Sequence, residues 1–190
     1  LTGGIKARLL TRVHNGLGGV TEIDYEQSTD QYLRDRDEGN EWSTTCPFPS
    51  QIVKEVRTRD QFDQVPGGWT EGVITVRYRY RDCYYDGKEH ESRGFAWAQE
   101  EHVGDANSPT SYTDHWFLQG KEDEALASKE FRTETWAYGA GTSKVYLSTS
   151  WTGYAVRTIM EPHAEDSAAG LVPDPGRAVR FAYAAETHSF

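Results

Sequence analysis

The sequence predicts an all-β protein made of antiparallel hairpins that follow one another as a meander. Apolar and polar residues alternate with a period of two along several segments, which is typical of strands with one wetter face. Turn signals rich in Gly and Pro separate these segments. The 190 residues include 11 Tyr, 7 Phe and 6 Trp, and aromatic residues favour pleated, half-buried surfaces.

The alternation places the expected strands in order along the chain. They are residues 20–26, 51–60, 72–86, 130–139, 143–160 and 177–190. The stretches NGLGG, VPGGW, YDGK, YGAGTS and PDPG supply turn chemistry between or beside them. The clearest strand is 72–86, where Arg77, Arg79 and Arg81 share one face. That face is interpreted as solvated, with contact to an enclosed cargo as the alternative.

Two polar, irregular stretches, residues 28–49 and 160–176, are predicted to be long surface loops. Helical signal is weak throughout, and residues 121–131 are the best candidate for a helical turn or two.

The glycine-rich stretch at residues 15–19 raises the question of a phosphate-binding loop. A Walker A loop needs a Lys and a Ser or Thr after its glycines, and none follows here. A dinucleotide fingerprint needs a third Gly where Thr21 stands, and a helix rather than an alternating strand. The stretch is therefore predicted to be a hairpin turn with Asn15-Gly16 or Gly18-Gly19 at its corner.

Charge and cysteine content limit the possible partners. Thirty acidic residues against 20 basic ones argue against nucleic acid and against an anionic membrane surface. No apolar run approaches the roughly 20 residues of a membrane helix. Cys46 and Cys83 are able to pair, but no spacing motif supports it, so their pairing stays open; each is interpreted as a packed or surface thiol rather than a nucleophile. The start at Leu1 suggests a fragment or a processed product.

No catalytic, cofactor-binding or metal-binding residue is assigned. Asp35, Asp37 and Glu38 depart from the calcium-loop spacing and are interpreted as a solvated acidic loop. Glu89 and Glu91 are the best carboxylate pair for a hydrolase, but chance pairs are expected among 30 acidic residues. The six scattered histidines form no metal motif: His14, His90, His102, His115, His163 and His188. Trp42, Trp69 and Trp97 are candidates for stacking on sugars, although core packing is the commoner role at strand spacing.

Several phrases in order resemble the middle region of bacterial insecticidal toxin-complex (Tc) B components and of the virulence-plasmid B type proteins, which adjoin RHS and YD-repeat sequences. They begin with LLTRVHNGLGGVTEIDYEQST and PFPSQIVKEVRTRD. VRYRYRDCYYDGKEHESRGFAWAQ and DHWFLQGKEDEALASKEFRTETW follow. The resemblance covers residues 8–136, whereas 137–190 shows only β character, with additional hairpins and a long loop. One departure is Ala127-Ser128, where the family commonly has a Gly.

The resemblance implies a single β-rich segment, residues 1–190, of a larger secreted toxin protein, either part of an RHS-like β-shell or a β-sandwich. In Tc toxins the B and C components form a hollow shell around a cytotoxic segment. The expected function is therefore structural: encapsulation and scaffolding of a toxic cargo by strand pairing with other shell segments or subunits, without enzymatic activity or a cofactor. A free-standing β-sandwich that binds carbohydrate is the alternative, and a carboxylate-dependent hydrolase is the third reading.

Overall fold

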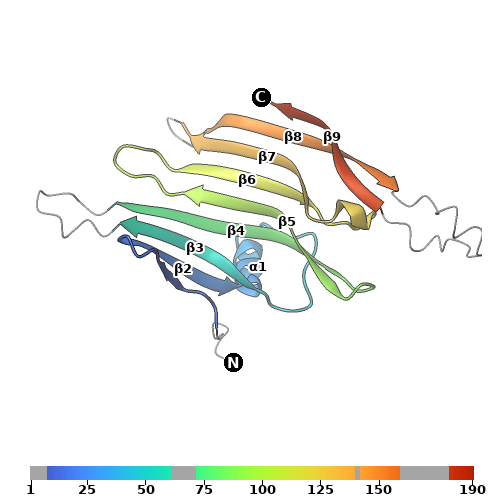
Figure 1. Cartoon of the computed structure of the whole chain (residues 1–190), viewed down its shortest axis with the longest axis horizontal. Helices are drawn as coiled ribbons and strands as arrows, with labels where there is room; N and C mark the ends of the chain where they lie inside the picture. Colours follow the sequence, from blue (N-terminus) through green and yellow to red (C-terminus); the bar gives the residue numbers. More distant parts are fainter. Residues whose placement is uncertain (1–7, 61–71, 140–141, 159–179) are drawn as a thin grey trace, which may run out of the picture.

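The computed structural model describes residues 8–60, 72–139, 142–158 and 180–190, which form one nine-stranded antiparallel sheet. Spatial order follows chain order from β1 to β9, so the described residues form the predicted meander (Figure 1). The strands are β1 (Arg12–His14), β2 (Gly19–Gln27), β3 (Gln51–Asp60), β4 (Val73–Asp86), β5 (Glu91–His102), β6 (Ser111–Leu118), β7 (Lys129–Tyr138), β8 (Lys144–Thr158) and β9 (Arg180–Ser189).

The glycine-rich stretch is the turn between β1 and β2, as predicted. Gly16 and Gly18 have φ of 74° and 94°, the left-handed region that glycine reaches without strain. The Asn15 side chain accepts hydrogen bonds from the backbone N–H groups of Leu17 and Gly19, both at 2.8 Å. The glycines therefore allow the left-handed backbone conformation of the turn, and a strand rather than a helix follows them.

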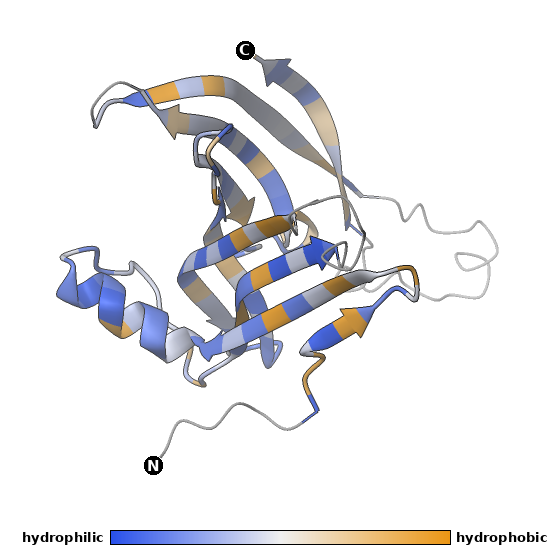
Figure 2. Cartoon of the chain, turned by 90° about the vertical axis from the view of Figure 1, so that its left-hand side faces the viewer, coloured by the Kyte–Doolittle hydropathy of each residue, from blue (hydrophilic) through white to orange (hydrophobic). Residues whose placement is uncertain are grey.

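The sheet is a single layer, so it has little core. Figure 2 shows a twisted, curved sheet with hydrophilic and hydrophobic residues alternating along its strands. Ile74, Leu147 and Phe181 remain more than half exposed, because no second layer of described residues covers them. The described residues thus show one sheet and not the two facing sheets of a β-sandwich.

The prediction of a surface loop at 28–49 is wrong for its first part, because α1 (Ser28–Asp37) forms there. Its buried positions are Ser28, Gln31 and Asp35, which lie three and four residues apart on one face. The backbone N–H of Gln27 donates to Asp30 at 3.4 Å at the start of the helix. A helix that buries polar residues leaves no apolar periodicity to detect.

Cys46 and Cys83, whose pairing the sequence left open, form a disulfide with Cα atoms 5.3 Å apart. The bond joins the loop after α1 to β4 across 37 positions of sequence. Such a pairing depends on tertiary contact, which spacing alone does not reveal.

The weak helical signal at 121–131 is a single 3₁₀ turn, η2 (Glu124–Leu126). The turn signals VPGGW and PDPG and the predicted loop at 160–176 lie outside the described residues.

Ser128, between η2 and β7, has φ of 60°, which strains a residue that carries a Cβ. Ser128→Gly should therefore raise the free energy of unfolding by about 0.5–1 kcal/mol. Glycine relieves the strain of the left-handed conformation, and this gain exceeds the stability lost because glycine increases the entropy of the unfolded chain. Ser150→Gly in the extended strand β8 is the control, with an expected loss of about 0.5–1 kcal/mol. Urea unfolding measures both. Equal destabilisation by the two changes would contradict the strain at Ser128.

Candidate interaction surfaces

A row of cations and aromatic rings crosses six neighbouring strands on one face of the sheet. Strand register sets each residue of the row opposite the next: Arg81, Trp97, Trp116, Arg132, Trp151 and His188. The Arg81 guanidinium lies 4.8 Å from the centre of the Trp97 ring, and that of Arg132 lies 4.6 Å from the centre of the Trp116 ring. Cation–π contact of this kind fixes the side chains while leaving them beside solvent.

Asp114 is the buried polar centre of the same face, only 5% exposed. It accepts hydrogen bonds from Gln99 Nε2 at 2.7 Å and from Trp136 Nε1 at 2.6 Å. The Trp136 ring stacks on Tyr112 with centroids 4.2 Å apart, and the Lys144 ammonium lies 3.9 Å from the centre of the Trp136 ring. Burial raises the pKa of Tyr112, and the nearby Glu101 carboxylate raises it further.

Towards β1 the same face becomes a lattice of ion pairs. Glu55 accepts from Arg77 Nε at 2.9 Å, and Arg57 reaches Asp24 at 2.9 Å. The hydrogen bond from Arg12 holds the pKa of Glu22 below its usual value. Each exposed pair contributes at most about 1 kcal/mol. The lattice therefore indicates a face adapted to water or to polar chains rather than to a second apolar layer.

The three arginines of β4 form ion pairs and remain partly exposed, with 50%, 43% and 30% of their side chains accessible for Arg77, Arg79 and Arg81, which agrees with a solvated face. Arg77 bonds Glu55, Arg79 lies 3.6 Å from Glu38, and Arg81 lies 3.1 Å from Asp35. Contact between this face and an enclosed cargo stays a prediction.

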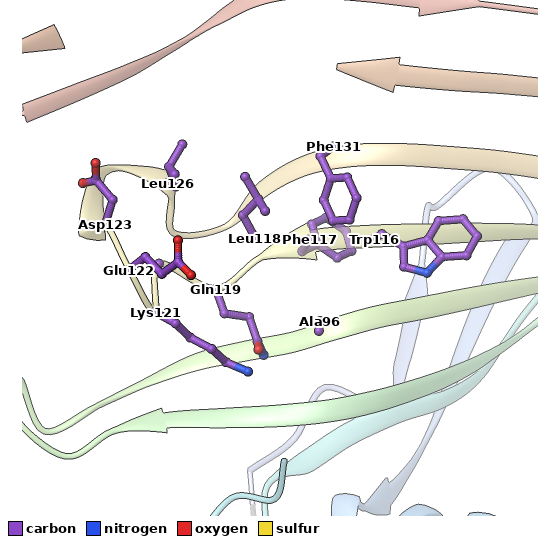
Figure 3. Close-up of a pocket in the computed structure, with 11 residues that line it drawn as sticks. Ala96, Trp116, Phe117, Leu118, Gln119, Lys121, Glu122, Asp123, Leu126 and Phe131 are labelled. Carbon is purple, nitrogen blue, oxygen red and sulfur yellow. The ribbon is translucent and has the colours of Figure 1, made fainter. Parts of the chain in front are cut away.

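Two hollows lie against the sheet, and Trp116 of the row lines both. The first, about 460 Å³, is lined by Arg79, Arg81, Trp97 and Lys144 among others. The second, about 420 Å³, lies beside β6, β7 and η2, and is lined mainly by apolar side chains such as Phe117, Leu118, Leu126 and Phe131 (Figure 3). In it the Gln119 amide nitrogen is already engaged, since it donates to the carbonyl oxygens of Asp82 and Gly94 at 2.8 and 3.0 Å.

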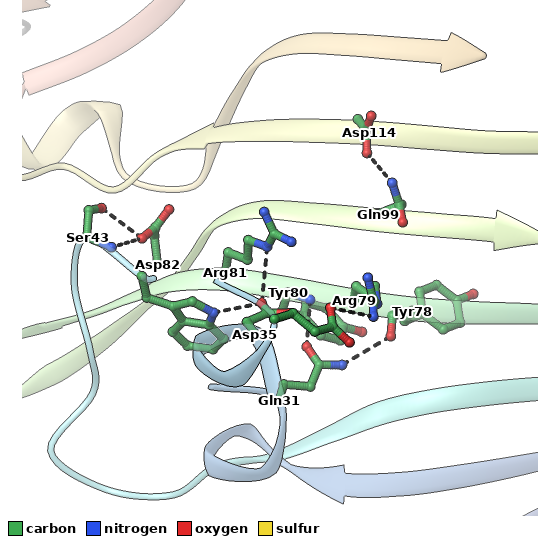
Figure 4. A network of polar contacts seen from close by, with 12 residues as sticks. Gln31, Asp35, Ser43, Tyr78, Arg79, Tyr80, Arg81, Asp82, Gln99 and Asp114 are labelled. Carbon is green, nitrogen blue, oxygen red and sulfur yellow. Dashed lines mark hydrogen bonds and ion pairs between the residues drawn. The ribbon is translucent and has the colours of Figure 1, made fainter. Parts of the chain in front are cut away.

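The acidic residues compared above with a calcium loop form hydrogen bonds and ion pairs within the fold. Asp35 accepts from Trp42 Nε1 at 2.8 Å and from Arg81 Nε at 3.1 Å (Figure 4). Asp37 and Glu38 lie at and just after the end of α1, where each pairs with an arginine. In the described parts of the chain no group of three or more His, Cys, Asp or Glu side chains is placed to hold a metal ion.

The remaining candidate residues do not converge on one site. Glu89 lies in the exposed β4–β5 turn, and Glu91 pairs with Arg93 at 2.7 Å. Trp42 is buried beside the disulfide, Trp69 lies outside the described residues, and Trp97 lines the first hollow. Sequence reasoning missed Trp116 and Trp136, whose roles depend on cross-strand register.

The histidines are dispersed over the sheet and its turns. His14 ends β1, His90 lies in the β4–β5 turn, His102 ends β5 and His188 lies in β9. His115 contacts Glu130 through Nδ1, and His163 lies outside the described residues. No described helix is long and apolar enough to cross a membrane.

The edges of the sheet are its second candidate interaction surface. Within the described residues β1 pairs only with β2, and β9 pairs only with β8. Edge strand β9 runs for ten residues and exposes Phe181 and Tyr183, at 53% and 45%. A long edge with exposed aromatics is a template for pairing with a further strand.

The solved structures that resemble the chain are Tc toxin assemblies. A Photorhabdus luminescens Tc holotoxin pore superposes with a TM-score of 0.75 at 16% identity, over 95% of this chain and 10% of that one. The complex TcdB2-TccC3 without its hypervariable C-terminal region gives 0.74 at 17% identity, over 96% and 10%. TcdB2-TccC3-Cdc42 gives 0.72 at 17% identity, over 95% and 10%. This chain thus spans about a tenth of the solved chains, and at such identity the likeness shows the fold.

Comparison with curated protein sequences gave no match. The family model for the insecticide toxin TcdB middle/N-terminal region matches residues 2–123, which is more than half of the chain. This match confirms the resemblance seen in the glycine-rich phrase and in the strands that follow it. The chain belongs to the family of the TcdB middle/N-terminal region.

Proposed function

We propose that the chain is a structural wall segment of a Tc-B/RHS-like toxin, which scaffolds and encloses a toxic cargo by strand pairing. The observation that carries this proposal is the single-layer sheet with two edge strands, each paired on one side only within the described residues. A sheet with ion pairs on one face and little core is suited to a wall with water on both sides.

The comparisons support the same proposal. The chain matches about a tenth of toxin chains solved as TcdB2-TccC3 complexes, which fits a segment of a larger sheet. Its partners would be the neighbouring shell segments or subunits, with an enclosed protein as cargo. On this proposal the segment acts in a secreted complex and contributes no catalytic residue or cofactor.

Light scattering of the full chain tests the strand pairing. With its edges unpartnered, the chain should associate into dimers or larger species. The double change Phe181→Lys and Tyr183→Lys should shift it towards monomer, because charge on an edge strand opposes pairing.

The control adds two lysines away from the edges, Leu33→Lys in α1 and Ile74→Lys in β4, both at exposed positions. It should keep the association of the parent chain. A wild-type chain that stays monomeric at every concentration would count strongly against pairing through the edges.

A further inference from the structure

Residues 28–50, called here the plug, form an excursion from the β2–β3 hairpin. Gln27 and Gln51, which flank it, are paired partners in the β2–β3 ladder. Ser28 and Ser50 close its base: Ser28 N donates to Ser50 O at 2.8 Å, and Ser50 N donates to Ser28 Oγ at 3.0 Å. The hairpin therefore holds the two ends of the plug together, whether the plug is docked on β4 or released from it.

The plug covers an edge of β4 that β3 leaves unpaired. β3 pairs with β4 only as far as Arg77. Beyond it, the Gln31 amide takes the place of a strand: its Nε2 donates to Tyr78 O at 3.2 Å, and its Oε1 accepts from Tyr80 N at 2.8 Å (Figure 4). One side chain thus satisfies two backbone groups of the sheet.

Ring contacts and hydrogen bonds also hold the loop that follows α1, among them Phe48 edge-on against Tyr85 at 5.8 Å between centroids and the Trp42 Nε1 donation to Asp35 at 2.8 Å. Trp42 packs edge-on against Tyr32 and Phe95, with centroids 5.6 and 6.0 Å apart. Ser43 donates to Asp82 Oδ1 through its backbone N–H at 2.5 Å and through its hydroxyl at 2.7 Å. The loop has one large buried apolar side chain, so its docking is weak against the conformational entropy lost when it is ordered.

The Cys46–Cys83 disulfide supplies the missing constraint, and it can be reached from the plug side. Cys83 is 1% exposed within β4, whereas Cys46 lies in the loop and is partly exposed. A cavity of about 210 Å³ lies directly beside the disulfide, lined by Tyr32, Trp42 and both cysteines among others. A small thiol can approach Cys46 from this side.

We propose that the Cys46–Cys83 disulfide is a redox lock on the plug. A dithiol reductant gives two electrons and two protons to the bond and becomes a disulfide itself, while Cys46 and Cys83 become thiols. The loop then leaves β4, Gln31 withdraws, and the β4 edge at Tyr78 and Tyr80 becomes free to pair with an extended chain. The plug stays closed in oxidising surroundings and opens in reducing ones. This proposal does not depend on the proposed shell function.

Amide hydrogen exchange on the full chain, with and without dithiothreitol, tests the lock. After reduction, the backbone N–H groups of Ser43 and Tyr80 should exchange at least about tenfold faster. Ser43 lies within the plug, and the Tyr80 N–H donates to Gln31 of the plug. Amides of the β6–β7 ladder should keep their exchange rates, since the hydrogen bonds and ring contacts of the plug reach β2, β4 and β5. Labelling of two thiols verifies the reduction, and reoxidation should restore protection.

Two variants separate the lock from the plug contacts. Cys46→Ala should show fast exchange at Tyr80 without reductant and no further change with it. Gln31→Ala should expose Tyr80 N–H while the disulfide stays intact. Unchanged protection of Ser43 and Tyr80 after verified reduction would overturn the proposal. Equal loss of protection across β6 and β7 would overturn it as well, since the bond would then hold the whole sheet together.

Discussion

Removal of the disulfide by the double change Cys46→Ser and Cys83→Ala should lower the free energy of unfolding by about 4 kcal/mol, the chain-entropy value for a loop of this length. The bond joins positions 37 apart, so the unfolded chain gains much freedom without it. Ala keeps position 83 apolar, because Cys83 is almost fully buried, while Ser suits the partly exposed position 46.

Urea unfolding followed by far-ultraviolet circular dichroism measures this loss. The control is the wild-type chain in excess dithiothreitol, whose stability should approach that of the double variant. A loss below about 1 kcal/mol would mean that the cross-link constrains the unfolded chain far less than its span predicts.

The second large effect is expected at Trp136, which is 3% exposed in the middle of β7. Trp136→Ala should cost about 3–5 kcal/mol, because it leaves a cavity beside Tyr112 and removes a donor from buried Asp114. Trp136→Phe keeps an aromatic ring but not the N–H, and should cost about 1–3 kcal/mol.

Trp151→Ala is the matched control, since Trp151 lies on the same face but is exposed. It should cost less than about 1 kcal/mol. Urea unfolding monitored by circular dichroism compares all three without relying on tryptophan fluorescence. If Trp136→Ala destabilised the chain no more than Trp151→Ala, Trp136 and Asp114 would not form the polar centre of the sheet.

The strands that could be predicted were those with clear alternation. Residues 51–60 coincide with β3, and 72–86 differs from β4 by one residue. β5 and β6 were not identified from their pattern, because residues such as Gly94 and Gln99 interrupt the alternation. Their place in the sheet depends on pairing with neighbours, which periodicity does not measure.

The plug escaped prediction for a different physical reason. Its helix buries Gln31 and Asp35, which stabilise the plug through hydrogen bonds to β4 and to Trp42. A hydropathy pattern treats such residues as surface. The cation–aromatic row was hidden in a similar way, because Trp97, Trp116 and Arg132 are far apart in sequence and meet only through register.

The fold and the sheet edges therefore lead to one functional account. A free-standing module would cover its apolar residues with a second layer, whereas the described sheet leaves them exposed and ends in a ten-residue edge strand. On this account, that edge strand forms one side of an interface with a further strand.

Electron cryomicroscopy of this chain within its assembled toxin tests the central claim most directly. The account predicts that β1 and β9 each hydrogen-bond to a further strand, so that the nine strands continue a larger wall around an enclosed chain. An assembly in which both edges face solvent would contradict it.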